Sequence, residues 1–389
     1  MNTTTLAAVD HDAPPAGLLF ELGEPVPTPT TEPSAALTPR LRYAERAQSE
    51  MRTASLDQLL PPDHDVRVVW AYVDELDLTA LLQRIKAVPG QPGRDATDPR
   101  ILLALWLYAT IDGVGSARTL DGLCREHLVY QWLCGGVSLN YHTLADFRSQ
   151  HTAILDQLLT DSVATMLHEN LITLKRVAQD GMRVRANAGA GSFRREKSLR
   201  ECLAEAKRQV EALKNQVDED QQAATRRQQA ARERAARERQ QRLEQALAER
   251  EKLVDKREQQ RREKGVKFDP AELRTSTTDP EAARMKMPDG GTRPAYNVQF
   301  ATTVEGGAIV GVDVSSSGSV TAGAQELYKL RAATAEWANA GARQRGLYQV
   351  TVRSRQKVLA VALLQALVHN LLRTVALRKA KKRMIKADQ

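Results

Sequence analysis

Apolar residues at helical spacing mark residues 50 to 160. Near the start of this region, five apolar positions recur about one helical turn apart: Val66, Val69, Val73, Leu76 and Leu81. Asp98 is followed by Pro99, a pair that suits a helix start because the carboxylate caps free amides and proline fits the first turn. Ser116 predicts another helix start, and Gly135 with Gly136 predicts a helix end. We therefore expect a helical N-terminal domain over residues 49–160.

The segment SLNYHTLADFRSQH predicts the last helix of this domain, with Leu144 and Phe147 facing inward. Short helices, a glycine-containing turn and a final helix with polar outer positions resemble a helix-turn-helix unit, whose second helix reads DNA. On this interpretation four exposed residues of the final helix bind DNA: Tyr141, His142, Thr143 and Arg148. A plain helical bundle explains the segment equally well.

A long helical block rich in Ala, Arg, Glu and Gln occupies residues 197–264. Its apolar seam repeats every seven residues at Leu203, Val210, Val217, Ala224 and Ala231, with Ala206 and Leu213 at the second seam position. The repeat restarts in another frame at Leu243, Leu247, Leu253 and Val254. We expect two helices folded back as an antiparallel coiled hairpin. Because Arg and Glu interleave, most of these charges are interpreted as a solvated face.

Strand-like patterns lie on either side of this block. The run LITLKRVAQD ends in Asp180 and Gly181, which together are typical of a turn. Residues 265–296 are expected to form a loop. The runs YNVQFATTV and AIVGVDV are separated by Glu305, Gly306 and Gly307, a spacing that predicts a β-hairpin. Residues 322–379 follow a helical pattern.

Charge and composition narrow the function classes. The chain has 389 residues, enough for two or three domains, and its net charge of +8 favours a polyanionic partner, with nucleic acid ahead of a membrane. An ordinary basic protein is the alternative. The three cysteines have neither metal-site spacing nor an even disulfide count, which suits a reducing cytoplasm.

The two ends of the chain are expected to be tails. Residues 1–48 are rich in Pro, Thr and Ala and carry too little apolar sequence to order themselves. They lack the pattern of a signal peptide, and the apolar windows further on are too short for an unbroken membrane span. Residues 380–389 form a basic tail. We expect a cytoplasmic protein that has no membrane partner.

Two acidic residues are candidates for metal chemistry. Asp180 at a strand end could bind Mg²⁺, which prefers oxygen ligands, although a turn-forming Asp is the simpler interpretation. Glu336 lies in a helical pattern with Arg343 on nearly the same face and Tyr328 and Arg331 one to two turns earlier. Such a carboxylate could hold a metal while its neighbours bind phosphate oxygens. An exposed helical ion pair is the alternative.

Several stretches, in order, resemble one family. They are DPRILLALWLYATIDGVGSARTLDGLC, NYHTLADFR, VAQDGMRVRANAGAGSFRR, TSTTDPEAARMKMPDGGTRPAYNVQFATT, YKLRAATAEWANAGARQRGLYQVTVRSRQKV and ALLQALVHNLLR. Together they resemble bacterial insertion-sequence transposases of the DDE class, specifically the IS1182-like group of the IS4/IS5-type superfamily. The resemblance implies Mg²⁺- or Mn²⁺-dependent cleavage and joining of double-stranded DNA at the terminal repeats of the element.

The resemblance also implies a fold and a site. The fold is mixed: a helical DNA-binding domain, then an RNase H-like core over residues 165–196 and 265–379, interrupted by the helical insertion. Asp180 corresponds to the first catalytic Asp and Glu336 to the catalytic Glu, and both would bind the metal. Tyr328, Arg331 and Arg343 match the signature around that Glu, with Arg331 one residue further away than in the best-known relatives. Arg345 is expected to contact DNA with them.

The middle acid of the family has no counterpart here. Between Val314 and Tyr328 the chain is too short for the helix and strand that would carry it, because each element averages five to twelve residues. We infer an internal deletion with its junction near residues 318–325. Asp313 is a poor substitute, because strand alternation turns it away from the face of Val312 and Val314.

The resemblance to the family and the missing middle acid leave three possible functions. The first is a DDE transposase whose catalysis is defective. The second is a DNA-binding regulator that competes with an intact transposase, alone or as a homodimer or hetero-oligomer with it. The third is a remnant without a selected function. Loss of the strand that carries the middle acid in the family is also expected to expose an edge of the sheet.

Overall fold

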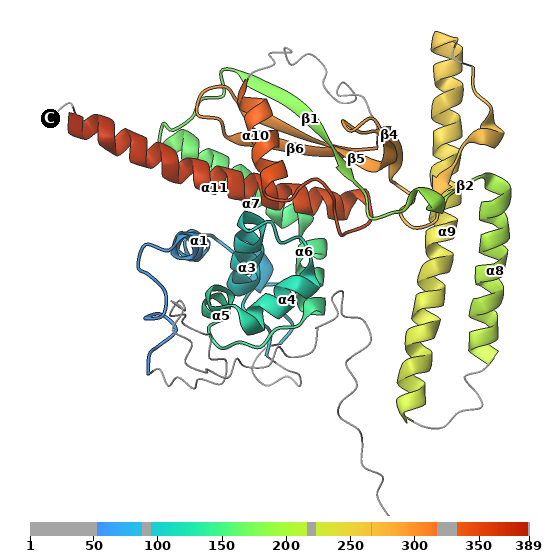
Figure 1. Ribbon diagram of the computed structural model, residues 1–389, viewed down its shortest axis with the longest axis horizontal. Helices are drawn as coiled ribbons and strands as arrows, with labels where there is room; N and C mark the ends of the chain where they lie inside the picture. Colours follow the sequence, from blue (N-terminus) through green and yellow to red (C-terminus); the bar gives the residue numbers. More distant parts are fainter. Residues whose placement is uncertain (1–52, 88–94, 216–222, 266, 317–332, 388–389) are drawn as a thin grey trace, which may run out of the picture. The chain divides into compact units, whose positions relative to one another are not determined.

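The computed structural model describes residues 53–87, 95–215, 223–265, 267–316 and 333–387 (Figure 1). The expected tail over residues 1–48, Tyr328, Arg331 and the proposed junction near residues 318–325 lie outside these ranges. Within them the fold is mixed, with many α-helices and antiparallel sheets. This agrees with the expected mixture of helices and strands.

Over residues 53–87 and 95–168, the structure describes seven helices of the N-terminal region. They are α1 (Asp65–Asp74), α2 (Thr79–Leu82), α3 (Pro99–Ile111), α4 (Ala117–Glu126), α5 (Leu128–Cys134), α6 (Tyr141–Gln150) and α7 (Thr152–His168). The predicted caps are confirmed: Asp98 accepts from the amide of Arg100, and Ser116 accepts from the amide of Thr119. Gly135 ends α5 with a φ of 56°, the left-handed conformation that glycine adopts at little cost.

Helix α3 is the centre of this region. Every residue from Ile101 to Thr110 is buried, so the helix is enclosed on all sides. The indole Nε1 of Trp106 donates to the carbonyl of Leu144 at 2.9 Å, which ties α3 to α6. A fully buried apolar helix of this length fits the sequence run ILLALWLYATI.

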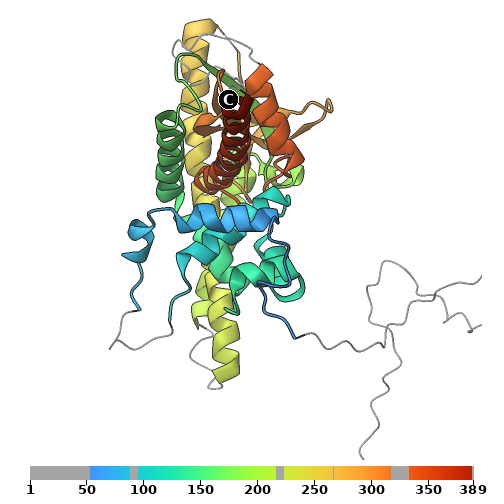
Figure 2. The same cartoon turned by 90° about the vertical axis from the view of Figure 1, so that its left-hand side faces the viewer.

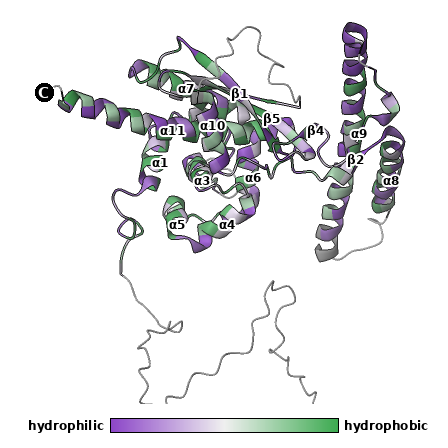
Figure 3. Ribbon diagram, turned by 45° about the horizontal axis from the view of Figure 1, so that its top comes forward, coloured by the Kyte–Doolittle hydropathy of each residue, from purple (hydrophilic) through white to green (hydrophobic). Residues whose placement is uncertain are grey.

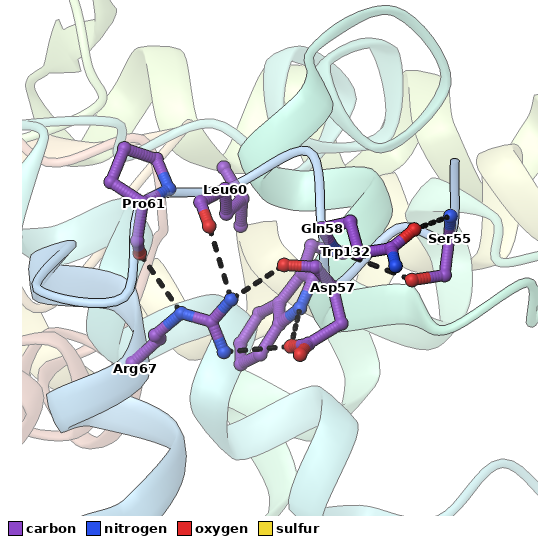
Figure 4. Close-up of polar contacts among 7 residues, drawn as sticks. All are labelled: Ser55, Asp57, Gln58, Leu60, Pro61, Arg67 and Trp132. Atoms are coloured by element: carbon purple, nitrogen blue, oxygen red, sulfur yellow. Dashed lines mark hydrogen bonds and ion pairs between the residues drawn. The ribbon is translucent and has the colours of Figure 1, made fainter. Parts of the chain in front are cut away.

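The segment that leads into α1 is held by Arg67 (Figure 4). Its guanidinium donates to the carboxylate of Asp57 at 2.6 Å and to the carbonyls of Leu60 and Pro61 at 3.2 and 3.0 Å. Trp132 donates to the same Asp57 carboxylate at 3.2 Å. These contacts lower the pKa of Asp57, chiefly through the hydrogen bond from Arg67.

Among the described residues, a four-stranded antiparallel sheet follows in sequence. Its strands are β1 (Val177–Arg185), β4 (Ala283–Lys286), β5 (Thr292–Thr303) and β6 (Ile309–Ser315). Strand β5 is central and pairs with the other three. The hairpin between β5 and β6 is confirmed, and its turn places Gly306 and Gly307 at φ of 86° and 66°.

The expected loop over residues 265–296 is wrong in part. The segment contains a 3₁₀ turn, η3 (Pro270–Glu272), the short strand β3 (Thr275–Ser276), all of β4 and the start of β5. Strand β3 pairs with β2 (Phe193–Arg194), which follows another 3₁₀ turn, η1 (Ala190–Ser192). The strands were missed because β3 and β4 are too short to show an alternating pattern.

Two C-terminal helices, α10 (Ala333–Gln344) and α11 (Arg355–Ala387), pack on the sheet and on each other (Figures 1 and 2). Helix α11 also packs against α3, α6 and α7. One continuous hydrophobic core therefore includes Trp106 and Leu155 of the helical region, Phe300 of the sheet and Leu363 of α11.

Helix α11 holds the hairpin turn through three side chains. Asn370 accepts from the amide of Ile309 and donates to its carbonyl, both at 2.8 Å. His369 Nε2 contacts the carbonyl of Gly307 at 2.8 Å, and Arg373 donates to the carbonyl of Gly306. The expectation that the apolar windows are too short for a membrane span is wrong for α11, which is long and apolar enough by composition. Its apolar window is 67% buried in the protein, as in a core helix.

The predicted helical hairpin is formed by α8 (Glu196–Asn215) and α9 (Ala223–Lys264), which lie side by side (Figure 1). Ion pairs from Arg239 to Glu205 and from Arg250 to Glu196 establish an antiparallel arrangement. The seam buries Leu199, Ala206, Leu243 and Ala246. Ala231 and Leu253, expected in the seam, are exposed, and α9 is mostly hydrophilic (Figure 3).

Candidate functional site

Asp180 lies inside strand β1, five residues before its end. The expectation that the strand stops at Asp180 in a turn is wrong, because β1 continues through Gly181 to Arg185 in register with β5. A Cβ atom at Gly181 would lie 2.7 Å from the side-chain oxygen of Asn297 on β5. Glycine at this position allows the two strands to approach closely, which is a common role of glycine inside a strand.

The carboxylate of Asp180 is bound by helix α10. Asn339 donates to it at 2.7 Å, and the amide of Gly181 donates to its other oxygen at 2.8 Å. Glu336 is exposed and lies three residues before Asn339 on the same helix. Residues three apart on a helix have Cβ atoms about 5 to 6 Å apart. The structure thus places the helix of Glu336 over the strand of Asp180, with Asn339 as the residue in contact.

Strand register separates Asp180 from Asp313. Asp180 is opposite Phe300, which in turn is opposite Val312, so these three side chains share the face that α10 covers. Asp313 is opposite Gln299 on the other face, and its side chain is exposed. The inference from alternation is confirmed: Asp313 cannot join the carboxylate of Asp180.

The oxygen atoms near Asp180 suit one hard cation better than two. Mg²⁺ is held in proteins by one or two carboxylates and several waters. Asp180 and Glu336 could supply the carboxylates, and the buried Asn339 has a side-chain oxygen without a hydrogen-bond partner. Across the described ranges, no three His, Cys, Asp or Glu side chains gather as a metal site. A pair of metal ions normally needs about three acidic ligands.

Replacing Gly181 by alanine tests the close approach at this site. The new methyl group would meet the Asn297 oxygen, so we expect the free energy of unfolding to fall by about 1 to 2 kcal/mol. Urea denaturation measures it. Gly311→Ala is the matched control, because its Cβ would only touch Ala301 at an ordinary 3.5 Å. When Asn297 is also replaced by alanine, Gly181→Ala should lower the free energy of unfolding by less than it does alone. If the two substitutions lower it by strictly additive amounts, the proposed clash is contradicted.

The helix-turn-helix candidates on α6 are partly accessible. His142 is exposed, and its ring centroid is 4.0 Å from that of Tyr141. Tyr141 also lies under the guanidinium of Arg118, 5.1 Å away. The amide of Thr143 donates to the capping oxygen of Asn140 at 3.0 Å. The first turn of α6 therefore offers an aromatic and a polar surface to solvent.

Arg148 is buried, and the expectation that it is exposed is wrong. Its guanidinium is 4.2 Å from the ring centroid of Trp106, and it donates to the carbonyl of Gly115 at 2.5 Å. Burial lowers its pKa to about 10. The sequence pattern counted Arg148 as a polar outer position because arginine is normally at the surface. Arg148 is thus a core residue, and it connects α6 to the turn that follows α3.

Arg345 is also drawn inward, whereas Arg343 on the same segment is exposed. The Nε of Arg345 donates to Gln365 on α11 at 3.1 Å, and burial lowers its pKa to about 10. Arg345 and Arg148 line the same small cavity of about 40 Å³ between α3 and α11. The structure thus engages Arg345 with α11, and its expected contact with DNA stays a prediction.

Two functional features escaped the sequence analysis. Asn339 is the first, and its spacing of three from Glu336 could have indicated that the two lie on one side of the same helix. The second concerns residues 380–389, which were expected to form a basic tail: helix α11 continues to Ala387, so Lys379, Lys382, Arg383 and Lys386 form a basic stripe on its last turns. Their spacings of three, one and three place them on one helix face. The neighbouring Arg378 and Lys381 are bonded to Glu169 instead.

Comparison with known proteins gives one match. Residues 54–150 match the model of a family described as a transposase domain, DUF772, and this range contains the helices α1 to α6. No curated protein and no solved structure matches the chain. The matched range covers the helical region and stops before the sheet. On this evidence the helical region supports a transposase family for the protein.

Proposed function

We propose that the protein is a DDE-class transposase that binds the DNA ends of its element but has lost most of its capacity for strand cleavage. The observation that carries the proposal is the packing of α10, which bears Glu336, over β1, which bears Asp180. The packing of these two elements, which come from distant parts of the chain, agrees with an RNase H-like core. The transposase-domain match over residues 54–150 supports the same class.

The proposed loss of cleavage follows from the acids. When bound, Mg²⁺ would supply Lewis-acid stabilisation of a phosphodiester. Asp180 and Glu336 could hold one ion, while the amide of Asn339 holds Asp180 in place. Asp313 lies on the opposite face of the sheet and cannot complete a second site. With one ion the two oxygens of an in-line displacement cannot both be stabilised.

The pairing at the outer edge of β1 is evidence for the proposal that the core is incomplete. In the part of the chain that the structure describes, this edge meets one parallel bridge, between Arg185 and Gln349. The amide of Arg185 donates to the carbonyl of Tyr348, and the amide of Val350 donates to the carbonyl of Arg185, both at 2.9 Å. A bridge of this kind is a short substitute for a paired strand, as expected after an internal deletion.

The DNA partner is supported by exposed polar and basic groups. His142 and Tyr141 lie at the start of α6, within the matched transposase domain. The basic stripe of α11 adds four cations, and α11 contains no acidic residue over its described length. Phosphate contacts from such groups position a protein on DNA, and side chains at a helix start can read bases. We place the protein in the cytoplasm with double-stranded DNA as its partner.

A regulator that competes with an intact transposase is the second candidate. It is favoured by the match of residues 54–150 to a transposase domain, because DNA binding would need this helical region but not two metal ions. Such a chain would occupy element ends alone, as a homodimer or with the intact enzyme. The two candidates differ in whether any Mg²⁺-dependent cleavage remains.

The test uses the full chain and the DNA that flanks its reading frame, in which inverted repeats would mark the element ends. Binding to these ends should exceed binding to random DNA and should weaken steeply with salt. His142→Ala should reduce the preference for the ends about tenfold, whereas the control His168→Ala, at the exposed end of α7, should leave it unchanged.

A plasmid excision assay with paired ends and Mg²⁺ tests cleavage. We expect no excision product. Excision that Asp180→Ala abolishes would contradict the proposed defect and establish an active enzyme. Equal affinity for ends and random DNA would contradict end binding, and with it both candidates.

A further inference from the structure

A hollow of about 430 Å³ lies between the helical hairpin and the loops beside it. Four arginines and two threonines form its polar lining: Arg194, Arg239, Arg242, Arg353, Thr277 and Thr278. Its remaining lining residues, Cys202 and Leu243, are uncharged, so no acidic side chain is among the residues that form the wall. Four guanidinium groups around one concavity make a site with strong attraction for an anion.

The arginines come from elements that are fixed to one another. Arg194 ends strand β2, which pairs with β3, and Thr277 follows β3 directly. The amide of Thr277 donates to the carbonyl of Ser192 at 3.0 Å. Arg239 and Arg242 lie three residues apart on α9, and Leu243 beside them is part of the hairpin seam. The hollow is therefore built by packing, not by chance approach of long side chains.

The positive charge of the hollow is only partly neutralised. Arg239 lies 3.5 Å from Glu205, and Arg242 lies 3.7 Å from Glu238, both outside the lining. Exposed ion pairs of this length contribute little. Arg194 takes part in none of the ion pairs among the described residues, and Arg353 donates to the carbonyl of Asn187.

Arg353 has one further electrostatic neighbour. Burial raises the pKa of Asp279, and the charge of Arg353 offsets part of that rise. The Asp279 side chain is fully buried and accepts from Tyr296 at 2.7 Å, so it does not reach into the hollow. Arg353 is exposed, and apart from its bond to the carbonyl of Asn187 its guanidinium is in none of the ion pairs among the described residues.

We propose that this hollow binds a phosphate group, either a phosphodiester of the DNA backbone or a free phosphate ion. Guanidinium groups match phosphate oxygens with paired hydrogen bonds, and threonine hydroxyls add neutral donors. The DNA source rests on the proposed function, whereas phosphate recognition does not. The site lies outside residues 54–150 and is therefore a second anchor beside the helical region.

The decisive variant is Arg194→Gln with Arg353→Gln, because both residues are exposed and neither holds an ion pair. The matched control is Arg257→Gln with Arg262→Gln, two exposed arginines of α9 that do not line the hollow. Both variants remove the same charge from the chain. Circular dichroism and melting in phosphate-free buffer confirm that each variant folds.

Two measurements distinguish the sources of phosphate. In the first, fluorescence anisotropy with a random DNA duplex is repeated over a range of salt concentrations. If the backbone binds, the hollow variant should bind about tenfold more weakly than the control, and its slope of log affinity against log salt should be smaller in magnitude by about 1, because one phosphate contact is lost. In the second, inorganic phosphate should raise the melting temperature of the control more than that of the hollow variant if a free ion binds.

Either difference supports the hollow as a phosphate site and names its source. A hollow variant that equals the control in both measurements would overturn the inference. A failure of the proposed function can be told apart from a failure of the phosphate site. The proposed function is tested by the preference of the unaltered chain for element ends over random DNA, which is a different measurement. Loss of that preference leaves both phosphate measurements interpretable.

Discussion

Replacing Asn370 by alanine is expected to lower the free energy of unfolding by about 4 kcal/mol, because two buried backbone groups lose their partners at once. Asn370 accepts from the amide of Ile309 and donates to its carbonyl at 2.8 Å, and its side chain is almost fully buried. Alanine supplies neither the accepting nor the donating atom, so both backbone groups of Ile309 lose their side-chain partner. Urea denaturation followed by circular dichroism measures the loss.

The control for Asn370 lies one turn further along α11. Thr374 donates only to the carbonyl of Asn370 within its own helix, so Thr374→Ala should cost less than about 1 kcal/mol. A loss for Asn370→Ala no larger than that of Thr374→Ala would contradict the assigned role. It would mean that the hairpin turn is held by His369 and Arg373 without Asn370.

Acidification is expected to destabilise the protein through His369. Burial, with the charges of Arg345 and Arg373, lowers the pKa of His369 to about 4, against 6.5 in an unfolded chain. The unfolded state therefore takes up a proton first as the pH falls. The contribution of His369 is complete above pH 6.5, declines between pH 6.5 and 4, and amounts to a loss of about 2 kcal/mol at pH 5.

His369→Gln isolates this contribution, because glutamine can still donate to the carbonyl of Gly307. His151 also has a pKa that burial lowers, so it adds to the same pH range in both proteins. The difference between the two stability curves from pH 7 to pH 5 therefore reports His369 alone. Parallel curves would contradict the assignment and place the titrating group elsewhere.

The helical region was the most predictable part of the fold. Its boundaries depend on residues within four positions of one another, such as Asp98 with the amide of Arg100 and Ser116 with the amide of Thr119. The β5–β6 hairpin was predictable for the same reason, since Gly306 and Gly307 adopt the conformation that the turn requires. Local rules suffice where the determining atoms are close in sequence.

Strand β1 shows where such rules stop. Asp180 with Gly181 is a common turn pair, yet the glycine serves a side chain of β5 more than a hundred residues away. Arg148 was misjudged for a related reason, because it is buried by an element that the sequence does not place beside it. The pairing of Asp180 with α10 came only from the family resemblance, which left Asn339 unnoticed.

The long reach of α11 has a consequence for synthesis on the ribosome. The apolar faces of α3 and α7 are covered by a helix that begins at Arg355, far beyond the end of α7 at His168. At typical translation rates of about 5 to 20 residues per second, the nascent chain would wait roughly 10 to 40 s for that cover. During this interval the nascent helices would present bare apolar surface, so this protein should depend on chaperones while it is being made.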